Sequence, residues 1–211
     1  MSYRTRTVRA RPTPTELTLD VIVDEAQELV DELGFNALSM RRLAARLGVG
    51  AMTLYGYVRT KEELLSALAN RYFDELELPV AGLDWRDEVA GVFRAVRWVF
   101  LEHPELLPIA ASQRLEGIGV YRGAERVFAA LRRPGLNGDE VVAAFDALTS
   151  FTIGAAERET GIQAQGLPGV RELDADEFPN VIGLAGALMT RDPEHSFEAG
   201  LELLLKGIAC R

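Results

Sequence analysis

The sequence holds a single cysteine and only two histidines. Cys210 has no partner for a disulfide within the chain, which fits a reducing compartment. Together with His103 and His195 it supplies too few soft ligands for a usual zinc site, so we expect no metal ion. A glycine-rich phosphate-binding loop is also absent, and we expect no cofactor.

Long apolar runs are missing as well. No run approaches the roughly 18 residues that a membrane span needs, and the arginine-rich N-terminus is not followed by the apolar segment of a secretory signal. Apolar residues make up 48% of the chain and charged residues 26%, as in ordinary globular proteins. We therefore expect a soluble, cytoplasmic protein of one or two domains, without a membrane partner.

Arrangements of catalytic residues are equally absent. The sequence offers no Ser/His/Asp or Cys/His set, and both histidines lie beside the ends of predicted helices. Catalysis would depend on carboxylates alone. These absences argue against an enzyme.

The net charge of −9 is distributed unevenly along the chain. Residues 1–61 contain nine Lys or Arg and seven Asp or Glu, a net charge of +2, so the remaining residues carry −11. Six of those seven acids lie between Asp20 and Glu32, where we expect them on the outer face of one helix. A basic N-terminal part on an acidic body favours phosphate binding that is confined to one face.

Apolar residues recur with helical spacing from Thr18 onward, and no convincing period-two strand or internal repeat is present. The sequence therefore predicts an all-α fold. Thr18 and Ser39 are candidate N-caps, and Thr60 with Glu63 forms a capping box. These signals predict N-terminal helices over 18–33, 40–47, 51–58 and 61–78. Beyond Pro79, helices are predicted over 84–102, 104–116, 118–133, 138–160, 176–190 and 193–209.

Residues 38–65 predict a specific motif. A helix of about eight residues, a glycine-bearing turn and a second short helix form a geometry that fits the major groove of DNA. Ala44 is small enough for a tight helix crossing, and Gly48 can adopt a positive φ at the turn. Leu47, Val49 and Leu54 would close a small core. The segment is therefore interpreted as a DNA-binding helix-turn-helix.

This segment resembles the N-terminal domain of the tetracycline-repressor (TetR) family of bacterial regulators. The resemblance is carried by the runs Asp31–Phe35, Leu43–Val49, Thr53–Tyr55 and Lys61–Leu65. More weakly, Asp84-Trp85, Phe151–Gly154 and Gly200–Leu203 resemble the regulatory domain of the tetracycline repressors themselves. The resemblance implies a ligand-responsive transcriptional repressor, with an N-terminal three-helix domain and a C-terminal helical domain.

The domain organisation follows from the pattern and the resemblance together. Residues 1–17 are expected to form a flexible basic arm, either a solvated tail or a segment that contacts phosphates or the minor groove. The helix-turn-helix domain spans 18–65, with a linking helix over 61–78. Residues 79–211 would form the regulatory domain, which binds a ligand and dimerises.

The resemblance also implies which residues contact double-stranded DNA. Met40 and Arg41 correspond to positions that contact a base edge and the backbone, and an arginine can bond a guanine bidentately. Tyr55 and Lys61 correspond to phosphate contacts, although Tyr55 could instead be a half-buried core ring and Lys61 a solvated lysine. The exposed side of the recognition helix would carry Ala51, Met52, Thr53, Gly56 and Tyr57. Since Gly56 departs from the bulkier family residues, we expect readout through thymine methyls, Arg41 and Tyr57.

A single short recognition helix reads too few bases to select a genomic site, so a homodimer on an inverted-repeat operator is expected. In the family, the third-last and last helices form the dimer, here about 138–160 and 193–209. The implied contact residues are Phe145, Gly154, Ala155, Phe197, Gly200, Leu201, Leu204 and Leu205. The same residues could instead be buried within one chain.

The resemblance further implies a small-molecule effector in the regulatory domain. The histidines of tetracycline binders are missing at the matching positions, so we expect an effector other than tetracycline. The remaining candidates describe a largely apolar pocket with two polar side chains. They are Val92, Val96, Ile109 and Phe128, with Gln113 and Arg126 as the polar members. The alternative is a packed core without a natural ligand.

A second function also stays open at this point. The small recognition surface would suit a helical ligand-binding or interaction protein whose DNA-reading domain is no longer sequence-specific. Salt-dependent DNA affinity would distinguish the two.

Overall fold

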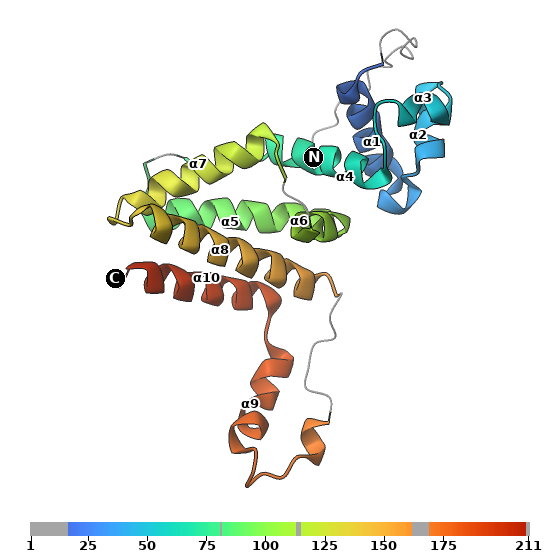
Figure 1. The fold of residues 1–211 in the computed structure, drawn as a ribbon. Helices are drawn as coiled ribbons and strands as arrows, with labels where there is room; N and C mark the ends of the chain where they lie inside the picture. Colours follow the sequence, from blue (N-terminus) through green and yellow to red (C-terminus); the bar gives the residue numbers. More distant parts are fainter. Residues whose placement is uncertain (1–16, 81, 113–114, 162–168, 210–211) are drawn as a thin grey trace, which may run out of the picture. The chain divides into compact units, whose positions relative to one another are not determined.

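The computed structural model describes residues 17–80, 82–112, 115–161 and 169–209. Throughout these ranges every regular element is a helix, which confirms the all-α prediction. The chain divides into two compact units, Met1–Arg71 and Tyr72–Arg211. Figure 1 shows the helices of both. Within the described ranges, no helix combines the length and the apolarity that crossing a membrane requires.

The helices of the first unit begin where the sequence predicts, because polar side chains cap them. They are α1 (Leu19–Leu33), the short 3₁₀ helix η2 (Phe35–Ala37), α2 (Met40–Leu47), α3 (Ala51–Tyr55) and α4 (Lys61–Asp74). The hydroxyls of Thr18, Ser39 and Thr60 each accept a hydrogen bond from the N–H three residues later, at 3.3, 3.3 and 3.1 Å. Glu63 accepts from the N–H of Arg59 at 2.7 Å. Each start is thus fixed by local hydrogen bonding.

The turn between α2 and α3 depends on a left-handed glycine. Gly48 has φ 71° and ψ 23°, a conformation that costs a residue with a Cβ atom about 1 kcal/mol. The N–H of Val49 donates to the carbonyl of Ala44 at 3.0 Å, which closes the end of α2. Leu47 and Leu54 then pack in a core where each is at most 1% exposed. Two of the three predicted core residues are therefore buried, whereas Val49 is only partly buried.

The arm predicted over 1–17 lies outside the described residues except for Leu17. That side chain is only 5% exposed, so the folded unit begins at least one residue before Thr18. The first unit is thus slightly longer than predicted.

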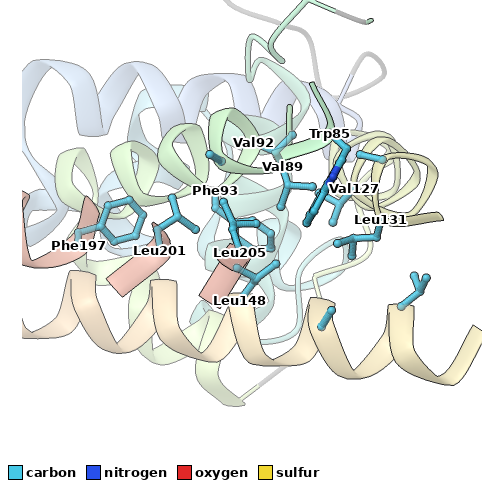
Figure 2. Close-up of a cluster of buried hydrophobic side chains, with 14 of the residues drawn as sticks. Trp85, Val89, Val92, Phe93, Val127, Leu131, Leu148, Phe197, Leu201 and Leu205 are labelled. Carbon is cyan, nitrogen blue, oxygen red and sulfur yellow. The ribbon is translucent and has the colours of Figure 1, made fainter. Parts of the chain in front are cut away.

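The second unit is a stack of helices. Its elements are α5 (Trp85–Glu102), η3 (Pro104–Leu106), α6 (Leu107–Ser112), α7 (Ile118–Arg132), α8 (Gly138–Glu159), η4 (Val170–Glu172), α9 (Pro179–Thr190) and α10 (Pro193–Ala209). Helix α5 contacts α7 and α8, and α8 contacts α10. Figure 2 shows their shared core, in which Trp85, Phe93, Leu131, Leu148 and Phe197 pack together. Helix α8 begins with a capping box, in which the side chains of Asn137 and Glu140 each accept the backbone N–H of the other residue.

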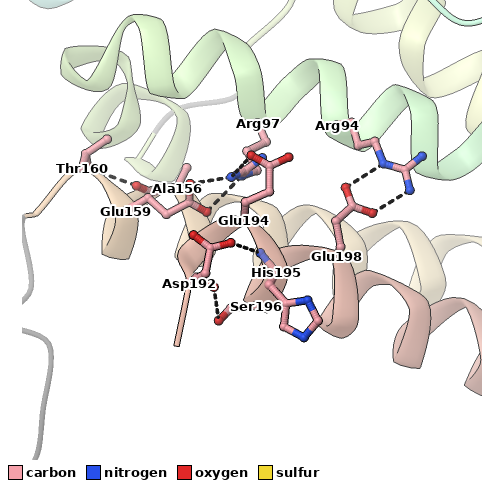
Figure 3. A network of polar contacts seen from close by, with 10 residues as sticks. All are labelled: Arg94, Arg97, Ala156, Glu159, Thr160, Asp192, Glu194, His195, Ser196 and Glu198. Carbon is pink, nitrogen blue, oxygen red and sulfur yellow. Dashed lines mark hydrogen bonds and ion pairs between the residues drawn. The ribbon is translucent and has the colours of Figure 1, made fainter. Parts of the chain in front are cut away.

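Two bidentate ion pairs, one largely buried and one exposed, join these helices at defined positions. The guanidinium of Arg97 on α5 donates to both carboxylate oxygens of Glu159 on α8, at 3.0 and 2.6 Å, and lies 4.7 Å from the ring centre of Phe197. Beside it, Arg94 donates to both oxygens of Glu198 on α10, at 2.7 and 2.6 Å (Figure 3). The hydrogen bonds from Arg94 hold the pKa of Glu198 below its usual value. The pairs fix how α5 lies against α8 and α10.

A third carboxylate, that of Glu88, is also enclosed. Its side chain is 5% exposed and contacts the guanidinium groups of Arg126 and Arg133 on α7. Burial raises the pKa of Glu88, but hydrogen bonds and charge from the two arginines outweigh burial and hold it below the usual value. Glu88 is therefore ionised in its buried position.

Helix α4 ends four residues before the predicted end at Leu78, so that prediction is wrong for the last turn. Pro79 disfavours a helical conformation at Leu78. In addition, the carboxylate of Asp74 accepts the N–H of Gly119 and its carbonyl accepts Arg122 at 2.7 Å. These bonds replace a further helical turn.

Other predicted boundaries also move. The third helix ends at Tyr55 instead of 58, since the N–H of Gly56 bonds to the carbonyl of Thr53 in a tighter turn. The helix predicted over 104–116 is a 3₁₀ turn followed by the short α6. Helix α9 begins at Pro179 instead of 176, because proline is pre-organised for the first position of a helix.

Candidate DNA-binding surface and ligand cavity

Helix α3 exposes nearly all its side chains. Leu54 is buried, whereas Met52 is 83% exposed and Tyr55 is 42% exposed. Tyr57 follows α3 and is also 42% exposed, so neither tyrosine is a core ring. The predicted recognition positions that are at least partly accessible are Ala51, Met52, Thr53, Tyr55, Gly56 and Tyr57. A surface of small and apolar groups with two phenols is therefore available to a ligand.

Met40 is placed differently from the prediction. Its side chain is 8% exposed and belongs to the core of the first unit. As the first residue of α2, it shares its inward face with Leu43 and Leu47. Only the backbone of Met40 remains for a contact with DNA, whereas the side chain of Arg41, the next residue, is exposed.

Two arginines of the first unit are neutralised within it. Arg46 on α2 donates to Glu25 and to Glu32 of α1, the latter at 2.9 Å. Arg71 on α4 pairs with Asp24 at 2.9 Å and with Asp20 at 3.4 Å. The acids that the sequence predicts on the outer face of α1 thus bind these arginines.

Three cationic side chains near α3 have no such partner. Arg41, Arg59 and Lys61 are exposed, and no carboxylate lies within ion-pair distance of them in the part of the chain that the structure describes. They flank the exposed side chains of α2 and α3 in sequence. Unpaired cations beside an exposed short helix are the arrangement that phosphate groups and base edges require.

Packing within the chain favours glycine at position 56, and the missing side chain also affects the exposed surface. A Cβ atom there would lie 3.1 Å from the carbonyl oxygen of Thr53, closer than an ordinary contact. Its φ of −70° requires no glycine. The absence of a side chain therefore permits the tight turn after α3 and leaves the recognition surface small.

The second unit contains a cavity of about 550 Å³ between α5, α7 and α8. Its volume lies within the range of small-molecule sites. Most of its walls are apolar, and five phenylalanine rings contribute to them: Phe73, Phe93, Phe100, Phe128 and Phe145. The remaining lining residues are Leu76, Val92, Val96, Ala110, Leu115, Glu116, Gly119, Val120, Tyr121, Gly123, Ala124, Val142, Asp146, Thr149 and Ile153.

The predicted effector residues divide into three groups. Val92, Val96 and Phe128 line the cavity. Ile109 and Arg126 are not among the lining residues. Ile109 is 6% exposed, and the guanidinium of Arg126 donates to Glu88 and to the carbonyl of Pro79, each at 3.1 Å. Gln113 lies outside the described residues. The polar groups of the lining are instead Glu116, Tyr121, Asp146 and Thr149, which sequence reasoning missed.

The predicted dimer residues also divide. Ala155, Phe197, Leu201 and Leu205 are at most 5% exposed and belong to the core of their own chain, which is the alternative that the sequence left open for them. Phe145 lies in the cavity wall. Gly154, Gly200 and Leu204 are partly exposed, and a Cβ atom at Gly200 would lie 2.5 Å from the Phe151 ring. The apolar face of α10 packs on α8 and α5 within the chain, which the helical period alone cannot distinguish from an interface.

Comparison with known proteins identifies the family. Residues 22–68 match the model of bacterial regulatory proteins of the tetR family, and residues 78–211 match the tetracyclin repressor-like C-terminal domain. The chain is 34% identical to an HTH-type transcriptional regulator of Saccharopolyspora erythraea, over 92% of this chain and 85% of that protein. It is 33% identical to the HTH-type transcriptional repressor DrrR1 of Streptomyces coeruleorubidus, over 93% and 78%.

A solved structure agrees with these relatives. The TetR family protein ActR from Streptomyces coelicolor, in complex with actinorhodin, matches with a TM-score of 0.78 and 32% identity, over 92% of this chain and 99% of that one. The chain therefore belongs to the TetR family of bacterial regulatory proteins, and it is a DNA-binding transcriptional regulator.

Proposed function

We propose that two copies of this chain bind an inverted-repeat operator through α2 and α3, and that a small, largely apolar molecule in the 550 Å³ cavity releases them. The observation that carries the proposal is the set of unpaired cations beside α3 in the same chain as an apolar cavity. DNA binding and release occur in the cytoplasm.

The roles of the DNA-binding residues follow from their chemistry and exposure. Arg41 reads a guanine through two hydrogen bonds, and Tyr57 reads a neighbouring base. Tyr55 and Lys61 hold phosphates, which fixes the register of the helix on the duplex. Met52, which is 83% exposed, supplies apolar contact for a thymine methyl.

Homodimer formation is supported by an uncovered face of α8. Ala143, Ala147, Ser150 and Gly154 form a stripe at spacings of four, three and four residues, and the first three are exposed. On α10, Leu203 is 69% exposed and its side chain faces away from the core. Small side chains allow two helices to approach closely, as an isologous four-helix contact requires. This face replaces the buried residues that the sequence suggested.

Coupling between cavity and DNA is supported by the last turn of α4. Phe73 lines the cavity, and Asp74 binds the first turn of α7 through Gly119. Tyr72 stacks on His103 with ring centres 3.9 Å apart. A ligand against Phe73 therefore acts directly on the helix whose first residue is Lys61. It releases DNA only if it prefers the state that binds DNA poorly.

Selection of bound duplexes from a random DNA pool, at roughly physiological salt, tests the DNA-binding part. We expect an inverted repeat whose half-sites are about 34–36 Å apart or a multiple of that. Recovery of no enriched sequence by a folded, dimeric protein would instead support a ligand-binding or interaction protein without sequence-specific recognition.

The variant Ala147→Arg tests the dimer face, because two arginines would meet across it. We expect a monomer in analytical ultracentrifugation and a loss of operator affinity of about 100-fold, since only one half-site is then held at a time. Ala129→Arg, an exposed position on α7, is the matched control and should remain dimeric. A dimeric Ala147→Arg protein would refute this face as the interface.

A cavity-filling variant tests the effector site. Ala124 lines the cavity, and Ala124→Trp would occupy part of its volume. The variant should bind operator normally but resist release by any compound that displaces the unmodified protein. Equal release of both proteins would place the effector elsewhere.

A further inference from the structure

The charged side chains of the described cavity lining are all acidic. Among its described lining residues the charged side chains are Glu116 and Asp146, and no lysine, arginine or histidine is present. Both acidic residues are exposed, and Tyr121 is also 56% exposed. The open side of the cavity is therefore bordered by two acids, whereas the phenylalanine rings form the interior.

These two carboxylates differ from the other acids near the core. Glu88, Glu159 and Glu198 each bind at least one arginine. For Glu116 and Asp146, the described part of the chain supplies no hydrogen bond and no ion pair. A carboxylate beside an apolar wall attracts a cation and repels an anion at the same position.

A third polar group points to a ligand as well. The hydroxyl of Thr149 is buried, and no hydrogen-bond partner for it lies in the described residues. Thr149 is on α8, three residues after Asp146, and lines the same cavity. A buried hydroxyl without a partner destabilises the empty site, so a ligand oxygen or N–H that bonds to it is favoured.

The walls restrict the shape of the ligand body. Phe128 and Phe145 meet edge to face with centres 5.0 Å apart, and Phe73 and Phe100 meet similarly at 5.8 Å. Such rings pack against a flat aromatic or alicyclic body, and their faces also attract a cation.

We propose that the effector is an amphipathic cation: a flat apolar body with a protonated amine that pairs with Asp146 and Glu116, and a polar group that bonds to Thr149. This assignment rests on the proposed function of the cavity as the effector site. It names the charge that the site selects.

The test uses three fluorescent probes that share one ring system but differ in charge. They are 9-(aminomethyl)anthracene, a cation at neutral pH, the neutral 9-anthracenemethanol and the anionic 9-anthracenecarboxylate. Binding to the full chain without DNA is followed by fluorescence anisotropy. We expect the amine to bind about fivefold tighter than the alcohol and about tenfold or more tighter than the carboxylate.

The double variant Asp146→Asn, Glu116→Gln should lose most of the amine's advantage over the alcohol. Glu125→Gln removes the same charge from an exposed residue of α7 outside the cavity and should keep that advantage. The isosteric substitutions in the double variant preserve volume, and circular dichroism verifies its fold.

Two results would overturn the inference. They differ in whether the cavity remains a ligand site. If the carboxylate binds as tightly as the amine, and Ala124→Trp blocks both, the cavity is a ligand site without selection for cations. If none of the probes binds, both the charge assignment and the cavity as the effector site are refuted. The selection of operator sequences remains an independent test of DNA binding.

Discussion

The two units use their charged side chains in opposite ways at their ligand surfaces. In the first unit the acids of α1 bind Arg46 and Arg71, and the cations that remain unpaired, such as Arg41, lie near α3. In the second unit arginines bind buried acids such as Glu88, and in the described part of the chain the acids that line the cavity have no such partner. Charges with a partner hold helices together, whereas unpaired charges at a ligand surface indicate the sign of the ligand.

The largest effect is expected where a paired charge loses its partner inside the second unit. Glu88→Gln leaves Arg126 and Arg133 without a counter-ion, and should lower the free energy of unfolding by about 3 kcal/mol. Urea unfolding at neutral pH measures this. Glu125→Gln, an unpaired exposed acid on the neighbouring helix α7, should change stability by less than about 0.5 kcal/mol. Equal effects of the two would remove the distinction between paired and unpaired charges.

The same variant has a pH signature. Because the pKa of folded Glu88 lies below its usual value of 4.5, its stabilisation is complete above that pH and is lost as the pH falls through the folded pKa. The stability difference between the unmodified protein and Glu88→Gln should therefore shrink on acidification below about pH 4.5. A constant difference would mean that the carboxylate is not preferentially ionised in the folded state.

A smaller effect, confined to DNA binding, is expected for an unpaired charge of the first unit. Arg41→Ala should weaken binding to the selected operator by about 1–3 kcal/mol and relax specificity at one base pair of each half-site. Its thermal stability should hardly change, since the guanidinium has no partner in the described part of the chain. Titration of operator variants measures the affinity.

Arg46→Ala is the matched control on the same helix. It removes a guanidinium that binds Glu25 and Glu32, so stability should fall while the order of preference among operator variants stays the same. A change of base preference in Arg46→Ala, or none in Arg41→Ala, would reverse the roles assigned to the two arginines.

The two units also differ in how far sequence alone predicts them. In the first unit the decisive contacts are local: Ser39 and Thr60 cap helices three residues away, and Gly48 ends α2. Short-range chemistry of this kind is visible in the residue types. The burial of Met40 could not be predicted, because a position at the start of a helix does not tell which way its side chain points.

In the second unit the helices could be predicted from the sequence, but the contacts between side chains of different helices could not. The arginine partners of Glu88 are 38 and 45 residues away in sequence, so nothing local distinguishes Glu88 from the unpaired Asp146. Helix α8 is apolar on several faces, and only packing separates the core residue Leu148, the cavity residue Phe145 and the exposed Ala147. The cavity and the outer face of α8 therefore required the structure.

Gly48→Ala tests the conformational requirement of the turn at a cost of about 1 kcal/mol in unfolding free energy. The left-handed φ of 71° is the cause, because a Cβ atom there would meet nothing within 4 Å. Gly50→Ala, at φ −73°, adds only an ordinary contact of 3.7 Å with Thr53 and should be neutral or slightly stabilising. Denaturant unfolding compares the two. Equal losses would point to packing instead of backbone conformation.

The smallest expected effect is on DNA affinity, and it tests whether the unpaired charge of Lys61 contacts a phosphate or a base. Lys61→Gln should weaken binding to every duplex by a similar factor and reduce the slope of log affinity against log salt by about 1 per chain, hence about 2 per dimer. Arg132→Gln, which removes an exposed charge from α7, should leave the slope unchanged. Because a phosphate contact carries no base information, the order of preference among operator variants should survive in Lys61→Gln and change in Arg41→Ala. A reordering in Lys61→Gln would mean that this lysine reads bases, and the first unit would then have no separate group for fixing its register.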